Sequence, residues 1–210
     1  MEQYNKYSSD FKTGDLILFN ENNIYSPLNI FSYLIKYFTK SDWSHIGMIV
    51  RDPEFTEKPL EKGLYLWESS FDFQDCEDKK MKLGVQIVKL EDKIKNYDGI
   101  IHWRKLDPGN VEITNEKLKI IHDLVHAKPY DLNIFDWINA LFEKVSKPVE
   151  SRYFCSALVG RIYEFLGLID DDIDWSIIRP SSFSMENMQD KTHIIMINGS
   201  KLENEIEIKK

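Results

Sequence analysis

Short apolar runs separated by turn residues fill the first half of the chain, a pattern typical of β-strands. Residues that favour turns, such as Gly, Pro, Asn and Asp, lie between the runs. The predicted strands are GDLILF (14–19), SHIGMIV (44–50), GLYLWESS (63–70), VQIVKL (85–90) and IIHWRKL (100–106). A later run, THIIMI at 192–197, is predicted to return as an edge strand.

After Pro108 the apolar residues recur every three or four positions, which is the spacing of an amphipathic helix. One helix is predicted around 118–125, a second within 134–145, and a third from Cys155 to a C-terminal cap at Gly167. Because a run of strands is followed by a run of helices, we expect an α+β fold with an antiparallel sheet and segregated helices.

An earlier helix is predicted at 26–38, SPLNIFSYLIKYF, with Ser26 as its N-cap and Pro27 at its first position. The segment is rich in aromatic and aliphatic residues. An ordinary amphipathic core helix accounts for this composition. The alternative is an apolar wall for an acyl chain, or a helix lying at a membrane interface.

The composition is that of a soluble globular protein, with 42% hydrophobic and 30% charged residues among 210. We expect a single domain over 1–210, with a core over about 11–198 and a charged, frayed tail at 199–210. The net charge of −8 comes from 27 basic and 35 acidic residues. This excess of negative charge argues against nucleic acid or an anionic membrane as the main partner. The sequence does not indicate the oligomeric state.

The N-terminal segment MEQYNKYSSDFKTGD lacks the apolar core of a secretion signal. Polar residues interrupt each long apolar stretch within about a dozen residues, which is too short for a transmembrane helix. The two cysteines, Cys76 and Cys155, do not make a disulfide framework and fit a reducing compartment. We therefore expect a cytoplasmic protein.

Cys155 is the first candidate for chemistry, because it stands where an apolar helix is predicted to begin. The free N–H groups and the dipole of a helix N-terminus stabilise an anion, so a thiolate is favoured there. The alternative is that Cys155 is a small buried apolar residue. Cys76 lies in the acidic segment FDFQDCEDKK, where negative charge disfavours a thiolate.

A nucleophilic cysteine needs a base, and the base needs an orienting group. His45 opens the strand SHIGMIV, next to a glycine that lets other groups come close. Glu68 follows Leu64 and Leu66 on one face of the next strand by alternation, so it needs a partner such as an imidazolium. The alternatives are a surface histidine and a strand-end glutamate that faces water.

A second pair of histidines lies in HDLVH at 122–126, one helical turn apart. The spacing is similar to that of the zinc motif H-E-x-x-H. However, the acid within it is Asp123, and no third ligand follows at a recognisable spacing. Partly buried structural histidines are therefore the favoured interpretation of His122 and His126, with a metallohydrolase as the alternative.

Several segments, in their order along the chain, resemble the circularly permuted branch of the NlpC-type papain-like superfamily. The resemblance points to YiiX-like proteins and, further away, to lecithin–retinol acyltransferase-like enzymes, and it covers roughly residues 11–185. The segments are TGDLILF, SDWSHIGMIV, LYLWESS, AKPYDLNIFDW and RYFCSALVGRIYEFLGL. By position it implies Cys155 as nucleophile, His45 as base and Glu68 as the group that orients the imidazole, with the order along the chain reversed relative to papain.

The expected function is that of a cysteine hydrolase, similar to a peptidase or amidase, which acts on an amide or ester carbonyl through a thioester. The alternatives are a lipid acyltransferase or thioesterase on the same triad, and a binding module without turnover. Peptide-like and acyl-lipid substrates both fit the resemblance, and no metal or organic cofactor is required. Two departures, the acidic connection after Glu68 and the segment NALFEKVSKPVES, affect substrate choice more than catalysis.

Overall fold

The structure is a computed structural model that describes residues 1–21, 42–70, 73–82, 84–126, 155–172, 178–186 and 193–209. Its centre is a six-stranded sheet with the order β4-β3-β2-β1-β5-β6, in which every pair of neighbours is antiparallel. The strands are β1 Leu16–Glu21, β2 His45–Arg51, β3 Leu64–Ser70, β4 Gly84–Lys89, β5 Gly99–Asp107 and β6 Lys201–Lys209.

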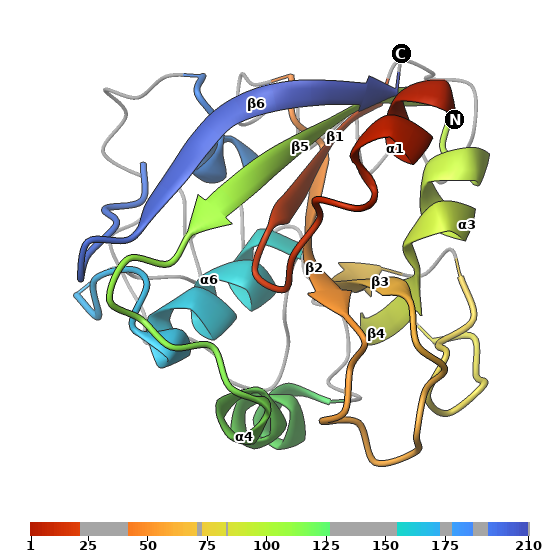
Figure 1. Ribbon diagram of the computed structural model, residues 1–210, viewed down its shortest axis with the longest axis horizontal. Coiled ribbons are helices and arrows are strands. Elements are labelled where there is room, and N and C mark those ends of the chain that lie inside the picture. Colours follow the sequence, from red (N-terminus) through yellow and green to blue (C-terminus); the bar gives the residue numbers. More distant parts are fainter. Residues whose placement is uncertain are drawn as a thin grey trace, which may run out of the picture.

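Helices cover both faces of this sheet (Figure 1). On one face α6 packs against β2 and β3, and α4 packs beside α6. On the other face α3 packs against β3 and β4, and α1 lies against β6. The helices are α1 Glu2–Tyr7, α3 Leu90–Asn96, α4 Asn115–Val125 and α6 Cys155–Leu166, with a short 3₁₀ helix at Pro180–Phe183. This arrangement confirms the predicted α+β fold with an antiparallel sheet.

Strand alternation divides the core into two apolar clusters, one on each face of the sheet. The cluster under α6 contains Leu18 and Met48 from the strands, and the cluster under α3 contains Phe19 and Ile49, their neighbours in sequence. All four side chains are fully buried. Any side chain on these strands is therefore directed to the α6 face or to the α3 face by its position in the alternation.

The predicted strands in the first half of the chain are confirmed with boundaries shifted by one or two residues. The predicted C-terminal cap of α6 is confirmed as well, and α4 begins at a capped turn. The hydroxyl of Thr114 accepts the N–H of Lys117 where α4 begins. Gly167 has φ +79° after α6, and its cap includes a bond from the N–H of Leu168 to the carbonyl of Tyr163. The predicted helices at 26–38 and within 134–145 lie outside the described residues.

Three predictions about local structure are wrong. Segment 90–99, for which no helix was predicted, contains α3, because Leu90 and Ile94 lie one helical turn apart and both bury against the sheet. The described part of the predicted strand 192–197 makes an isolated bridge with Ile169. The tail expected to fray forms β6 instead. Among the described residues, every helix is too short or too polar to cross a lipid bilayer.

The edge strand β6 predicts a measurable contribution of the tail to stability. Ile208 is fully buried, so Ile208→Ala should lower the free energy of unfolding by about 2–5 kcal/mol in urea titrations. Glu207 is exposed on the same strand, and Glu207→Ala should change it by less than about 0.5 kcal/mol. Equal stabilities of the two variants would mean that the tail does not pair with β5 in solution.

Candidate active site

His45 and Glu68 form a hydrogen-bonded pair across two adjacent strands. His45 is the first residue of β2, and Glu68 lies in β3 on the same face as Leu66. The Nε2 atom of His45 is 2.6 Å from Oε2 of Glu68, and the glutamate side chain is fully buried. The prediction that this carboxylate faces the interior and pairs with an imidazole is therefore confirmed.

The second carboxylate oxygen of Glu68 has two further partners. Nζ of Lys93 lies 2.9 Å from Oε1, and the side-chain amide of Gln86 donates to the same oxygen at 3.0 Å. Lys93 comes from α3, and only 2% of its side chain is exposed. Its ammonium group also lies over the rings of Phe19 and Phe73, at 5.6 and 5.2 Å from their centroids.

Lys93 and Gln86 are site residues that the sequence analysis missed. Gln86 lies opposite Glu68 in the pairing of β3 with β4, so the register of two correctly predicted strands was enough to find it. Lys93 could be found only with α3. The signal was the pair Leu90 and Ile94 at helical spacing, which places Lys93 beside Ile94 on the buried side.

These contacts set the charges of the pair. Burial by itself would raise the pKa of Glu68, but the positive charges of Lys93 and then of His45 lower it to about 2. Burial by itself would lower the pKa of His45, but the Cys155 side chain and Glu68 raise it to about 9. At neutral pH the pair is therefore an imidazolium beside a carboxylate.

Cys155 is the first residue of α6, as predicted, and its side chain is within hydrogen-bonding reach of His45. Only 2% of Cys155 is exposed. The backbone N–H groups of the first helical turn have no partner within the helix, so they favour negative charge at this position. The structure thus brings together the three side chains that the sequence analysis selected.

The position of Cys155 depends on how α6 is held against the sheet. Apolar side chains of the helix, among them Leu158 and Ile162, are fully buried in the core beneath it. The hydroxyl of Ser156 donates to the carbonyl of Ile178 at 2.7 Å. Near the other end, the hydroxyl of Tyr163 donates to the carbonyl of Gly14 at 2.5 Å, just before β1. Because both ends are anchored, the cysteine has a defined place beside His45.

Gly47, two residues after His45 in β2, leaves room for the side chain of Leu66 on the neighbouring strand. A Cβ atom at Gly47 would lie 2.8 Å from Cγ of Leu66, which is closer than side-chain atoms approach one another. Leu66 therefore occupies the space above the glycine. This close packing accounts for a residue without a side chain two positions after His45 in β2.

The surroundings of Cys76 differ from those of Cys155. It is half-buried, and its backbone N–H donates to the carbonyl of Ile87 at 2.8 Å. Burial raises the pKa of its thiol above the usual value, and the negative charge of Asp75 adds to this rise. The predicted direction is confirmed, although burial has a larger effect than the acidic neighbours.

The histidines of HDLVH lie on α4 and meet a carboxylate that the motif does not contain. His122 is fully buried, and His126 is partly exposed. Nε2 of His122 lies 2.9 Å from Oε2 of Glu77, which belongs to the connection between β3 and β4. The fold thus places beside the two histidines a carboxylate that the sequence spacing did not provide.

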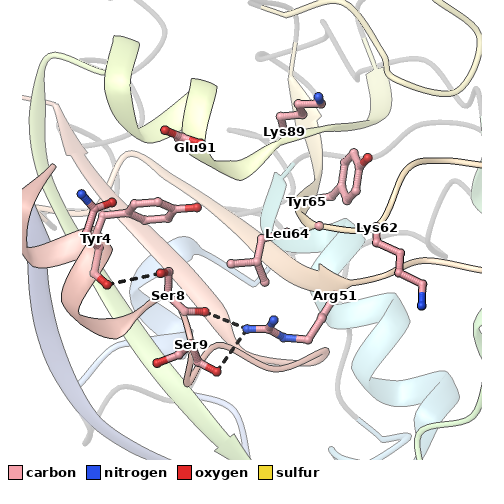
Figure 2. A pocket seen from close by; sticks show the side chains of 11 residues that line it. Tyr4, Ser8, Ser9, Arg51, Lys62, Leu64, Tyr65, Lys89 and Glu91 are labelled. Atoms are coloured by element: carbon pink, nitrogen blue, oxygen red, sulfur yellow. Dashed lines mark hydrogen bonds between the residues drawn. The ribbon is translucent and has the colours of Figure 1, made fainter.

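A separate pocket of about 560 Å³ opens between α1, β2 and β3 (Figure 2). Its lining includes Arg51 and Leu64 but none of the three predicted site residues. The guanidinium of Arg51 donates to the carbonyls of Ser8 and Phe11, both at 2.7 Å. Because its donors are used in this way, Arg51 joins the N-terminal segment to the sheet.

Comparisons with known proteins give distant similarities. No family model matches the chain. Among curated proteins, the chain is similar to the uncharacterized protein R372 of Acanthamoeba polyphaga mimivirus, with 30% identity over 110 residues that cover 47% of this chain and 39% of the viral protein. Among solved structures, it is similar to the metalloprotein yiiX from Escherichia coli O157:H7, with a TM-score of 0.46 and 23% identity.

The similarity to yiiX covers 73% of this chain and 65% of the other. The chain therefore spans less than two thirds of the length of either relative.

The raised pKa of His45 predicts its charge state in solution. At about pH 7.5 the imidazole of His45 should carry a proton on both nitrogens, because its pKa is about 9. His102 is an internal control, since burial lowers its pKa below 6.5 and keeps it neutral. Long-range ¹H–¹⁵N spectra of ¹⁵N-histidine-labelled protein distinguish these states.

Two variants test which groups raise the pKa of His45. Glu68→Gln and Cys155→Ala should each lower the pKa of His45, because each removes a group that raises it, while the His102 signals stay in place. A neutral His45 in the wild-type protein at this pH would contradict the described pair.

Proposed function

We propose that the protein is a cysteine hydrolase, similar to a peptidase or amidase, with Cys155 as nucleophile, His45 as base and Glu68 as the orienting group. The observation that carries the proposal is the buried His45–Glu68 pair, 2.6 Å apart, with Cys155 within reach of the same imidazole at the start of a helix. A nucleophile, a base and a group that orients the base are the parts that thiol acyl transfer needs.

In the first half of the reaction, the Cys155 sulfur attacks the carbonyl carbon of an amide or ester and forms a C–S bond. His45 accepts the proton of the thiol. When the tetrahedral intermediate collapses, His45 gives this proton to the leaving amine or alcohol as the C–N or C–O bond breaks. The products of this step are a thioester on Cys155 and the free leaving group.

In the second half, His45 removes a proton from water, and the hydroxide attacks the thioester carbonyl. The C–S bond then breaks, the acid is released, and the thiol of Cys155 is restored with its proton again shared with His45. If another nucleophile takes the place of water, the same residues carry out acyl transfer. Hydrolase and acyltransferase therefore differ in the acceptor and not in the triad.

The negative charge on the carbonyl oxygen also needs stabilisation in both halves. The backbone N–H of Cys155, at the first position of α6, is a suitable donor, because the first N–H groups of a helix have no internal acceptor. Glu68 keeps the imidazole oriented, and Lys93 holds the second oxygen of Glu68. We assign Lys93 as a positioning residue that acts through Glu68.

The proposal includes a papain-like fold in which the functional residues follow a permuted order. The base and the acid come from β2 and β3, and the nucleophile comes from a later helix. The substrate is an acyl compound with an amide or ester bond, either a peptide-like molecule or an acyl lipid. The segment 26–38, for which an apolar wall for an acyl chain was the alternative interpretation, lies outside the described residues, as does the segment NALFEKVSKPVES.

Cys155 should be the first thiol to react with iodoacetamide, although it is the less exposed of the two cysteines. The reason is that Cys155 lies within reach of His45, which can take its proton, whereas burial raises the pKa of Cys76. Peptide mass spectrometry after limited labelling of the native protein measures the order. The matched control is His45→Ala, in which labelling of Cys155 should slow by at least about tenfold while that of Cys76 is unchanged. Labelling of Cys76 first would refute the assignment.

Turnover of acyl and peptide probes should separate the roles of the base and its neighbours. His45→Ala should abolish hydrolysis, and Glu68→Gln should reduce kcat by a smaller factor, because an orienting group contributes less than the base itself. Lys93→Met should change the pH profile of kcat, since it removes the charge that lowers the pKa of Glu68. Gln74→Ala, at an exposed position, is the control and should leave kcat unchanged.

The same measurements test the alternative classes. A binding module would keep its ligand affinity in Cys155→Ala and show no turnover in the wild type. A metallohydrolase on α4 would lose turnover in His126→Ala and keep it in Cys155→Ala. Turnover that survives Cys155→Ala would therefore overturn the proposed function.

A further inference from the structure

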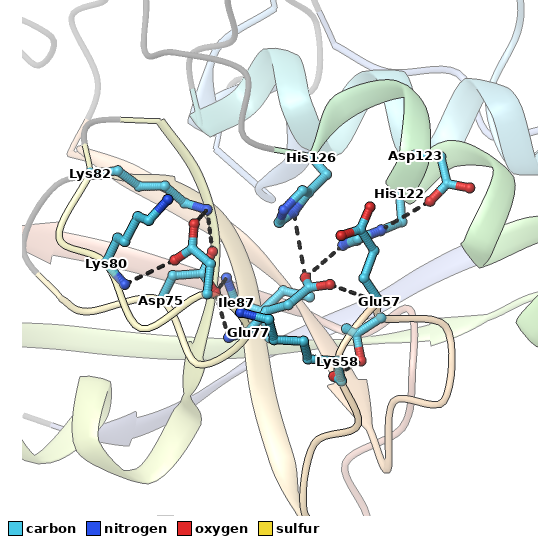
Figure 3. Close-up of polar contacts among 12 residues, drawn as sticks. Glu57, Lys58, Asp75, Glu77, Lys80, Lys82, Ile87, His122, Asp123 and His126 are labelled. Carbon is cyan, nitrogen blue, oxygen red and sulfur yellow. Dashed lines mark hydrogen bonds and ion pairs between the residues drawn. The ribbon is translucent and has the colours of Figure 1, made fainter.

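Three side chains with metal-binding atoms meet at the end of α4, and the proposed hydrolase does not use them. They are Glu77, His122 and His126, and one ligand atom of each lies within 4.8 Å of the others. Figure 3 shows both imidazoles directed from α4 toward the carboxylate of Glu77, which comes from the connection between β3 and β4. Within the described part of the chain, Cys155 does not belong to this cluster.

The carboxylate of Glu77 divides its two oxygens between different partners. Oε1 accepts the backbone N–H of Glu57 at 2.5 Å. Oε2 faces the two imidazoles, at 2.9 Å from Nε2 of His122 and 3.4 Å from Nδ1 of His126. Ligand atoms bound to a tetrahedral Zn²⁺ at 2.0–2.1 Å lie about 3.3 Å apart. The observed separations from Oε2 therefore lie close to those that one ion would require.

Hydrogen bonds within the protein hold these ligands in place. The backbone N–H of Glu77 donates to Oδ1 of Asp75 at 2.9 Å, and the same aspartate is paired with Lys82. The two histidines are one helical turn apart, with ring centroids 4.6 Å from each other. Glu77 is therefore held in place, and the two rings lie close together on α4, with ligand atoms within 4.8 Å of one another.

Nδ1 of His122 is buried and makes no hydrogen bond to any described residue, and the acidic group beside it is Asp123. Its Oδ1 atom lies 3.5 Å from Nδ1 of His122, on the side of the ring opposite to Glu77. A neutral imidazole carries one proton, so it can donate to one of these two carboxylates. With a metal on Nε2, the ring keeps the proton on Nδ1 for Asp123, and both carboxylates have a suitable partner.

We propose that Glu77, His122 and His126 form a Zn²⁺ site that joins the end of α4 to the connection between β3 and β4. Two imidazoles and one carboxylate favour Zn²⁺ over Ca²⁺ or Mg²⁺, which prefer oxygen ligands alone. The rings of Phe55 and Trp67 pack around His122 at 5.5 and 5.8 Å, which favours a small number of ligands. Water completes the coordination on the side of His126, the most exposed of the three ligands.

We infer that the ion stabilises the fold, separately from the triad, with one position open to water. Glu77 and His122 are almost fully buried, and they connect two segments that are 45 residues apart in the chain. An ion bound to the folded state but not to the unfolded chain stabilises the fold in proportion to its affinity. Zinc should therefore raise the melting temperature without being needed for the reaction at Cys155.

Competition with a chromophoric chelator tests the site with zinc chloride and the metal-free protein of residues 1–210. The wild type should bind one Zn²⁺ per chain, and zinc should raise its melting temperature. His126→Ala should weaken binding by at least about 100-fold and abolish the thermal shift, since it removes one of three ligands. Asp123→Asn should weaken zinc binding by about tenfold, which is the lower end of the loss seen when a group that contacts a metal-bound histidine is changed. X-ray absorption should show nitrogen and oxygen ligands at about 2.0–2.1 Å.

Two control variants test whether zinc binds at these three residues and not elsewhere on the protein. Glu116→Gln changes an exposed acid on the same helix and should leave zinc affinity unchanged. Cys155→Ser should also bind zinc as the wild type does, and a loss in this variant would place the ion at the thiolate instead. Equal zinc affinities of the wild type and His126→Ala would overturn the proposal and leave His122 and Glu77 as an ion pair.

Discussion

The negative charge of Glu68, buried in the middle of the molecule, is the constraint on which the site and much of the fold depend. A carboxylate without exposure to solvent is costly unless every oxygen has a partner. The partners are His45 from β2, Gln86 from β4 and Lys93 from α3. Because each comes from a different element, this charge requires the register of three strands and the position of one helix at the same time.

His45 connects the two faces of the sheet. Glu68 and Lys93 lie on the α3 face, whereas Cys155 belongs to the apolar cluster under α6 on the other face. An imidazole in the middle of a strand could contact groups on one face only. His45 is the first residue of β2, so its ring stands at the end of the sheet, where it interacts with both Glu68 and Cys155. The end of a strand is thus a position from which one imidazole can contact both Cys155 on the α6 face and the Glu68 side chain on the α3 face.

The parts of the fold predicted correctly are those with a strong local pattern. The first five strands alternate or are continuously apolar, and α6 has a clear apolar stripe with a glycine after it. The elements that were missed, α3 and β6, consist mostly of charged residues. Their few apolar side chains, such as Ile94 and Ile208, are buried by contact with the sheet. Tertiary packing, and not local hydrophobicity, stabilises these two elements.

By itself, the sequence determined the first five strands, the start of α6 at Cys155, and three candidate residues, because each depends on patterns within a few neighbouring positions. Only the tertiary structure decided which charges meet. Lys93 reaches Glu68 across 25 residues, and Glu77 reaches His122 across 45. Neither pair has a signal in sequence spacing, since contact between distant segments depends on how strands and helices pack. Burial then turns these contacts into strong ones, because buried charges without partners would destabilise the fold.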